Sequence, residues 1–465
     1  AVFSDFMQVM WHGLSLDATT AGYLTALPLL AILISIWFKK FPLKKLLYPY
    51  YIIAAALVSI VFVVDMGLYP FWGFKLDASI FLYLDSPKEA MASVSVGFII
   101  LRVLVMLLLS AGLTWLMAKV TPSRLEAVKH KLLGTLGMLL FGGVLFVIIR
   151  GGVTESTSNV GQVYFSSNQF LNHSAVNPCF SLLSSMGKSK DFASEFNFFD
   201  EEERAKWMEG IYPTTDGDSI VEVLNTKRPN ILLIMLEGFG SKFVEPLGGL
   251  PDVAPNLNRL SKEGVFFTNC YANSFRTDRG TVSVLSGYLG LPTVSVMKVP
   301  AKSRTLPAIS EELLKAGYAT DFLYGGDINF TNMKSYLLGK GFQKLTADTD
   351  FSLAEQNSNV WGVSDDITST WLLNTLKERV EGPWFTTYLT LSSHEPFDVP
   401  YARLEEKIPN AFAYTDACLG ELIDGLKQTP LWKDLLIVCV PDHGFCYPQG
   451  TTDRGGEFSH IPMLW

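Results

Sequence analysis

The chain has 465 residues, of which 49% are hydrophobic and 18% carry a formal charge. Soluble globular proteins average about a quarter charged residues, so this composition excludes a disordered chain and indicates that part of the chain lies in lipid. The net charge of −8 argues against nucleic acid as a partner, because binding to phosphate backbones requires clustered lysines and arginines. Residues 1–150 carry 12 basic and 7 acidic side chains, whereas residues 151–465 carry 25 and 38. The two parts therefore face different solvents.

Four apolar stretches match the roughly 20 helical residues that cross a hydrocarbon core. They cover Ala21–Phe38, Leu46–Val64, about Met91–Ala118 and Leu132–Ile149, and they predict a transmembrane helical domain over residues 1–150. The third stretch contains Arg102, which either extends to the outer interface or holds a lipid phosphate. No signal-peptide pattern precedes these stretches, and we expect an earlier helix before Ala1.

The short connections between these stretches predict the orientation of the chain. The first holds only basic charges, as does most of the third, whereas the second balances two lysines against three acidic residues. The first connection contains Lys39, Lys40, Lys44 and Lys45. The third contains Lys119, Arg124, Lys129 and Lys131. The second contains Lys75 and Lys88 together with Asp77, Asp85 and Glu89. The positive-inside rule places the first and third connections in the cytoplasm. The sequence thus predicts a multi-pass protein of the cell (inner) membrane whose domain after Arg150 is extracytoplasmic.

Residues 151–228 predict an irregular juxtamembrane linker with one charged helical segment, FDEEERAKWMEGIYP, and with His173 in a structural role. Residues 229–465 alternate apolar strands with amphipathic helices, which is typical of a mostly parallel sheet covered on both faces. The strands are expected at 230–237, 319–326, 384–394, 434–444 and 460–465. Because the last strand pattern reaches Trp465, we expect further sheet and helix beyond it.

Charged and imidazole side chains follow four of these strands. Glu237 ends the first, Asp327 and His394 follow the next two, and the Asp442–His443 pair follows the fourth. In open α/β sheets, ligands bind at the carboxyl ends of the strands. Four such residues at one edge are what a metal or phosphate site requires.

The segment NSFRTDRGTVSVLSGY places Thr277 at or near the N-cap of a short helix that Gly287 ends. Free backbone N–H groups and the dipole at a helix N-terminus favour an anion. A hydroxyl at this position can attack phosphorus if a metal lowers its pKa. An ordinary cap would explain Thr277 alone, but the nearby candidate ligands Glu237 and Asp442–His443 favour a nucleophile.

The order of these motifs resembles the alkaline phosphatase superfamily. The motifs are Glu237 after the first strand, R-T-D-R-G-T from Arg276, S-x-H-x-P-F around His394, and P-D-H-G around Asp442. Within the superfamily the whole chain is most similar to the polytopic branch of lipoteichoic acid synthases and phosphoglycerol transferases. This resemblance implies transmembrane helices followed by a sulfatase-like, three-layer α/β catalytic domain over residues 229–465.

Carried over to this chain, the resemblance implies that Thr277 is both nucleophile and metal ligand. It implies that the other ligands of one divalent ion, Mn²⁺ or Zn²⁺, are Glu237, Asp442 and His443, a donor set that suits either ion. His394 would contact the transferred phosphate or act as a general acid. The candidate substrate contacts are Arg276, Asp327, Asn332 and His460.

The segment FLYGGDINFTNMKSY departs from the pattern of the synthases. There, a histidine, a tryptophan and an arginine hold the glycerophosphate headgroup, whereas this chain offers Tyr324, Asp327, Asn329, Thr331, Asn332 and Met333. His460 resembles a histidine of phosphoethanolamine transferases, although its spacing differs. The donor headgroup therefore remains open.

The resemblance implies a two-step transfer of phosphoglycerol from a membrane lipid such as phosphatidylglycerol to a glycan or lipid acceptor. Phosphoethanolamine transfer by the same chemistry is the nearest alternative. A hydrolase is another alternative, although Thr277 lacks the C/S-x-P-x-R pattern of sulfatases. A non-catalytic scaffold or transporter accessory protein is the alternative from a different class.

Overall fold

The computed structural model describes residues 3–38, 40–78, 80–81, 96–123, 125, 128–187, 192–209, 223–379, 382–448 and 456–465. Four of its helices are long and apolar enough to cross a membrane, which confirms the four predicted spans. They are α1 (Phe3–Ser35), α2 (Leu43–Trp72), α5 (Val96–Val120) and α6 (Lys131–Arg150). The first begins well before the predicted Ala21, because Leu16 in its N-terminal half is buried against the linker.

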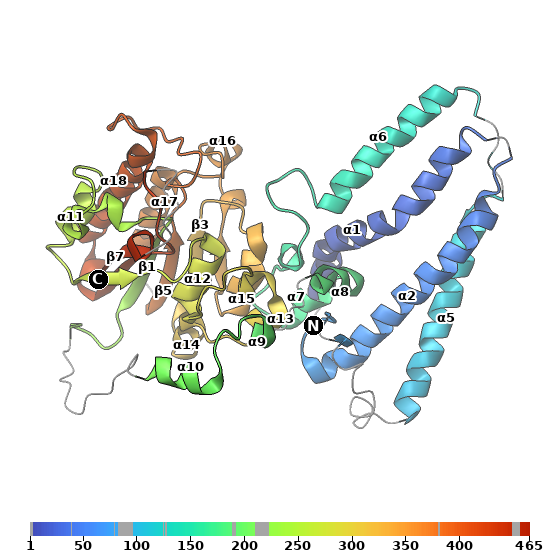
Figure 1. Cartoon of the computed structure of the whole chain (residues 1–465), viewed down its shortest axis with the longest axis horizontal. Coiled ribbons are helices and arrows are strands. Elements are labelled where there is room, and N and C mark those ends of the chain that lie inside the picture. The colour runs from blue at the N-terminus through green and yellow to red at the C-terminus, as the bar shows by residue number, and fades with distance from the viewer. Residues whose placement is uncertain are drawn as a thin grey trace.

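The α1–α2 and α5–α6 connections lie together at the end of the helices remote from the α/β domain (Figure 1). The Trp37 indole there donates to Thr135 Oγ1 at 3.1 Å. The predicted loop residues Lys39, Lys88, Asp85, Glu89 and Arg124 lie outside the described residues. The basic connections and the α/β domain thus occupy opposite ends of the helices, and their assignment to the two sides of a membrane stays a prediction.

Arg102 lies on α5, near the end of that helix closer to the α/β domain. Its guanidinium carbon is 4.3 Å from the centroid of the Phe98 ring, and its Nε is buried without a hydrogen-bond partner among the described residues. A Cβ on Gly67 of α2 would lie 3.4 Å from that nitrogen. The Arg102 side chain therefore lies against α2 at Gly67.

The linker is more regular than its polar sequence predicted. Its helical segments are η1 (Val160–Val163), α7 (Gln169–Ala175), α8 (Pro178–Met186), α9 (Phe192–Glu195) and α10 (Glu201–Met208). Asn159, Asn168, Asn177 and Asp200 each accept a hydrogen bond from a backbone N–H at the start of one of these segments. The Asn-rich pattern that suggested irregular structure is thus a series of helix N-caps.

Hydrogen bonds join the linker to the membrane helices. The Asn177 amide donates to Asp17 Oδ1 of α1 at 2.7 Å, and the hydroxyls of Thr19 and Ser158 lie 3.2 Å apart. His173 of α7 lies 3.0 Å from the Tyr69 hydroxyl of α2, and burial, together with nearby basic groups, lowers its pKa to about 4. His173 therefore has the structural role that the sequence predicted.

Two further bonds join the linker to the α/β domain. The Asn159 amide donates to the Asn329 carbonyl at 2.9 Å, and the Gly161 N–H donates to Asn332 Oδ1 at the same distance. The linker therefore bridges the two parts of the chain, although its predicted boundaries at residues 150 and 228 stay predictions.

The α/β domain contains a seven-stranded sheet in the order β2-β7-β6-β1-β5-β3-β4. The strands are β1 (Asn230–Leu236), β2 (Phe266–Tyr271), β3 (Ala319–Tyr324), β4 (Lys344–Thr346), β5 (Trp384–Leu389), β6 (Leu435–Pro441) and β7 (His460–Leu464). Five strands are parallel, whereas β7 pairs antiparallel with β2 and β6. The sheet confirms the predicted fold class, and the prediction missed β4, which has only three residues, and β2, whose FFTNCY sequence is not a continuous apolar run.

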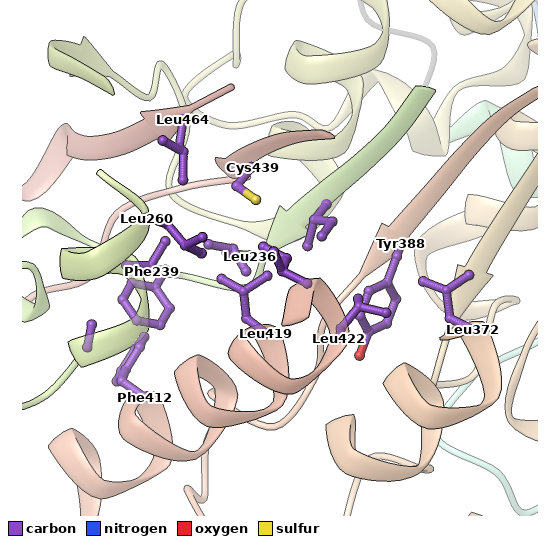
Figure 2. Packing of buried hydrophobic residues seen from close by; sticks show 14 of the residues in the cluster. Leu236, Phe239, Leu260, Leu372, Tyr388, Phe412, Leu419, Leu422, Cys439 and Leu464 are labelled. Carbon is purple, nitrogen blue, oxygen red and sulfur yellow. The ribbon is translucent and has the colours of Figure 1, made fainter. Parts of the chain in front are cut away.

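The sheet is covered on both faces because alternate residues of its central strand β1 point in opposite directions. Leu232, Ile234 and Leu236 enter the core formed with α11 (Pro255–Leu260), α17 (Asp365–Glu378) and α18 (Lys407–Lys427), where Leu236 packs near Leu419 and Phe239 (Figure 2). Leu233 and Met235 enter the opposite core with α12 (Thr277–Ser286), α14 (Ile309–Lys315) and α15 (Met333–Gly339). Residues beyond Leu236 emerge between these layers at the sheet edge.

Candidate active site

The register of the central strands brings three potential metal ligands together. Leu236 of β1 is opposite Pro441 of the parallel strand β6, so the next residues, Glu237 and Asp442, leave the sheet side by side. One ligand atom from each of Glu237, Asp442 and His443 lies within 4.8 Å of the others. The two carboxylates are 4% and 2% exposed. The strand ends thus form the cluster that the sequence predicted.

The hydrogen bonds around this cluster leave ligand atoms directed toward its centre. Asp442 Oδ1 accepts from the backbone N–H groups of Gly238 and His443, whereas its buried Oδ2 has no hydrogen-bond partner among the described residues. His443 Nδ1 lies 2.7 Å from the Gly444 carbonyl, which can only accept, so this nitrogen carries the hydrogen. Its Nε2 faces Glu237 Oε1 at 3.2 Å and Asp442 Oδ2 at 3.7 Å. These donors fit a divalent cation.

The pKa values of Glu237, Asp442 and His443 are shifted because two buried carboxylates lie beside one imidazole. Burial, followed by the charge of Glu237, raises the pKa of Asp442 to about 7. Burial alone would lower the pKa of His443, but the two carboxylates raise it to about 10. Burial opposes ionisation of Glu237, yet the hydrogen bond and charge of His443 bring its pKa below the usual value. A proton on His443 therefore occupies the place that a divalent cation would take.

Thr277 is the first residue of α12, behind the extended N-cap residue Arg276. Its hydroxyl donates to Glu237 Oε2 at 2.9 Å. An ordinary threonine cap would accept a hydrogen bond from its own helix, so this hydroxyl is directed to the cluster of potential metal ligands instead. The open N–H groups of α12 lie on the same side and can stabilise phosphoryl oxygens.

Gly280 allows α12 to approach the cluster. A Cβ at this position would lie 2.2 Å from the Asp442 carbonyl oxygen, a distance that no side chain can adopt without movement. On the other side, Gly238 has φ +59° and a Cβ there would lie 3.3 Å from the His443 ring. The spacing of Thr277 from the ligands therefore depends on two glycines.

We expect Gly280→Ala to lower stability by about 1–3 kcal/mol, because overpacking shifts α12 away from β6. Catalytic activity should fall further than stability, since Thr277 moves with the helix. Thermal unfolding and turnover of a soluble phosphodiester measure the two effects. The control is Gly187→Ala, because a Cβ on Gly187 of the linker meets no atom within 4 Å. Unchanged activity in Gly280→Ala would contradict the prediction.

A cleft of about 360 Å³ opens over Thr277 and the cluster. Arg276, Asp327 and His394 line it, as predicted for substrate or phosphate contacts. His394 donates from Nδ1 to the Glu395 carbonyl at 2.8 Å, so its Nε2 stays available, and its ring centroid is 4.7 Å from that of Trp361. The cleft therefore combines an imidazole, a guanidinium and a carboxylate around the Thr277 hydroxyl.

Two predicted substrate contacts lie elsewhere. Asn332 has its side chain engaged by the Gly161 N–H and by the Met297 carbonyl, and it does not line the cleft. His460 begins β7 and does not line the cleft, because its Nε2 donates to the Thr268 carbonyl of β2 and its ring stacks on Tyr271. The structure does not bring either side chain to Thr277.

Several lining residues were not predicted, and three of them come from segments outside the predicted motifs. Glu155 comes from the linker, Trp361 from the loop before α17, and Lys298 from a segment after α12, where it pairs with Asp278 Oδ2 at 3.2 Å. None of them follows a strand or lies in a recognisable motif, so the sequence offers no signal for them. The linker is thus part of the wall of the cleft.

A family model described as Sulfatase matches residues 229–464, just over half of the chain. The chain belongs to the sulfatase family. The predicted resemblance to the alkaline phosphatase superfamily is therefore confirmed, and the cleft lies within the sulfatase domain apart from its linker residue Glu155.

Similar proteins include lipoteichoic acid synthases. The enzyme from Staphylococcus aureus (strain USA300) is 26% identical over 236 residues, which cover 47% of this chain and 36% of that protein. The chain thus matches little more than a third of this curated relative. A solved alkaline phosphatase superfamily protein from Vibrio parahaemolyticus is 32% identical, with a TM-score of 0.47 over 51% of this chain and 60% of its own. The lipoteichoic acid synthase LtaP from Listeria monocytogenes is 20% identical, with a TM-score of 0.46 over 51% and 65%.

Proposed function

We propose that the protein is a metal-dependent transferase that moves a phosphoglycerol group from a lipid such as phosphatidylglycerol to a glycan or lipid acceptor outside the cytoplasm. The observation that carries the proposal is the Thr277 hydroxyl, held 2.9 Å from Glu237 Oε2 at the start of a helix and open to the cleft. Membership of the sulfatase family and similarity to lipoteichoic acid synthases support it.

In the first step, Thr277 Oγ1 attacks the lipid phosphorus while the P–O bond to diacylglycerol breaks. Glu237 Oε2 accepts the hydroxyl proton, the N–H groups of α12 hold the equatorial oxygens, and His394 protonates the departing oxygen. An acceptor hydroxyl then attacks the phosphothreonine ester and restores the threonine. A bound divalent ion, Mn²⁺ or Zn²⁺, held by Glu237, Asp442, His443 and Thr277, supplies Lewis acidity.

The wall of the cleft opposite the cluster favours one alternative headgroup. Asp327, Glu155 and Glu395 contribute carboxylates there, and the rings of Trp361 and Phe330 lie edge to face at 6.1 Å. Carboxylates beside aromatic rings suit a cationic group. Phosphoethanolamine transfer is therefore the second candidate.

One experiment separates these candidates. The full chain in lipid nanodiscs is incubated with an equal mixture of phosphatidylglycerol and phosphatidylethanolamine, and released diacylglycerol is assigned to its donor by distinct acyl chains. We expect consumption of phosphatidylglycerol alone and a phosphoglycerol adduct on the peptide containing Thr277. An ethanolamine adduct would establish the second candidate.

Two further outcomes of this experiment would contradict a transferase. Rapid hydrolysis of a soluble diester without acceptor, and no lipid consumption, would indicate a phosphodiesterase. Absence of both activities and of stoichiometric metal would indicate a scaffold.

A further inference from the structure

A second cavity of about 510 Å³ lies between the membrane helices and the sulfatase domain. Its walls come from the residues that follow α2, from the linker helices α7 and α8, and from α13 (Pro300–Ser303) and α15. It shares only Lys298 with the catalytic cleft. It is therefore a separate space that meets the cleft at one wall.

The lining of this second cavity is basic and rich in hydroxyl groups. Its basic side chains are Lys75, Lys298, Arg304 and Lys340, and its only acidic side chain among the described residues is Asp77. All three lysines are paired with carboxylates, and Lys75 and Lys340 are largely buried, but the Lys298 side chain remains 42% exposed. Hydroxyls come from α8, from α15 and from the segment around Arg304. Ammonium, guanidinium and hydroxyl groups together suit a phosphodiester that carries a polyol.

A third cavity of about 440 Å³ continues from the second toward the membrane. It lies between α1, α2, α7 and α8, and it shares Lys75, His173 and Val176 with the second cavity. Its membrane-facing walls include Met10 of α1 and Met66 of α2, which are 53% and 56% exposed. In Figure 1, α7 and α8 lie between α1 and α2 at this end of the helices. A space lined mostly by apolar side chains, in which the carboxylates of Asp17 and Asp65 are engaged by Asn177 and Lys75, thus adjoins the basic cavity.

We propose that the second cavity binds an anionic phospholipid, with its phosphodiester against Lys298 and Arg304 and its acyl chains in the third cavity. The three adjoining cavities lead from the hydrocarbon region to Thr277, and Lys298 forms the wall across which the headgroup passes. The identity of the lipid as the donor rests on the proposed function, whereas its binding in this cavity does not.

Gly339, at the end of α15, offers a direct way to fill the second cavity. It lines the cavity, its φ lies outside the left-handed region, and a Cβ there would meet no atom within 4 Å. We therefore expect Gly339→Trp to occupy the headgroup space, and Gly339→Ala to leave it open. Ser184→Trp fills the same space from α8, on the opposite wall, and serves as an independent second variant.

The binding test uses the full chain with Thr277→Ala, so that no lipid is consumed. Native mass spectrometry should show one retained phosphatidylglycerol, at least tenfold reduced by Gly339→Trp or Ser184→Trp and unchanged by Gly339→Ala. Soluble glycerol phosphate at the same concentration should not bind. Retention of lipid in both tryptophan variants, or equal binding of glycerol phosphate, would overturn the proposal.

The activity test compares two substrates on the same variants. Release of diacylglycerol from phosphatidylglycerol should fall at least tenfold in the tryptophan variants, whereas hydrolysis of bis(4-nitrophenyl) phosphate, which reaches the cleft from water, should persist and report correct folding. If lipid binds in a Gly339-sensitive manner but is never consumed, the proposed function fails and the lipid site stands. If lipid turnover is unaffected in folded tryptophan variants, the lipid site fails and the proposed function stands.

Discussion

Thr277→Ala should abolish transfer, with a loss of roughly 10⁴-fold or more, because removing a nucleophile leaves only the contribution of binding and electrostatics. The hydroxyl of Thr277 is the one directed at Glu237 from the start of α12. Diacylglycerol release in nanodiscs measures the loss. The phosphorylated peptide containing residue 277 should disappear at the same time.

The matched control is Thr277→Ser, which keeps the oxygen and loses only the methyl group that restricts χ1, so its activity should stay within about tenfold of the original. Metal content separates the loss of a nucleophile from the loss of the site. Thr277→Ala should still bind one divalent ion at saturating concentration through Glu237, Asp442 and His443. Normal transfer by the alanine variant would disprove the mechanism.

Asp442→Asn should have opposite effects on stability in the presence and absence of metal. With metal, the variant loses an anionic ligand, and its affinity should fall by at least about 100-fold, since even changes outside the ligand set cost about 10–100-fold. Without metal, burial and the charge of Glu237 hold the pKa of Asp442 near 7, well above its ordinary value. The fold therefore disfavours the ionised carboxylate, and asparagine removes that penalty.

The sign of the pH dependence follows from this raised pKa. The metal-free protein should lose stability as pH rises from about 4, where the unfolded carboxyl ionises, through about 7, where the folded one does. Thermal unfolding in a chelator should give similar midpoints for both proteins at pH 4, and a higher midpoint for Asp442→Asn at pH 8. Asp424→Asn, which changes a surface carboxylate paired with Arg259, serves as the control. A lower midpoint for Asp442→Asn at pH 8 in chelator would contradict this account.

The grouping of Glu237, Asp442 and His443 could be predicted because its geometry follows from local rules. Each ligand directly follows a buried strand, and parallel strands in neighbouring positions bring their carboxyl ends to one edge. Thr277 could be placed because the following Gly287 marks the end of a short helix. Predicting where these residues lie relative to one another required only the order of the strands in the sheet.

The remaining wall of the cleft depends on long-range packing and could not be predicted. Asn332 lies only a few residues from Asp327, yet its left-handed backbone turns the side chain toward Gly161 and away from the cleft. His460 starts β7 at the same sheet edge as the Asp442–His443 pair, because β7 runs antiparallel to β6, but contacts with β2 hold its ring against Tyr271 and the Thr268 carbonyl. Glu155 reaches the cleft only because the linker docks on the sulfatase domain.

The hydrogen bonds on both sides of the linker fix how far the catalytic domain can reach. Asp17 and Thr19 of α1 hold the linker at one end, and Asn329 and Asn332 hold it at the other. These contacts therefore hold Thr277 at a fixed distance from the ends of the helices. If the proposed transfer takes place, the donor lipid and the acceptor must therefore both come to Thr277, because these hydrogen bonds hold the α/β domain against the membrane helices.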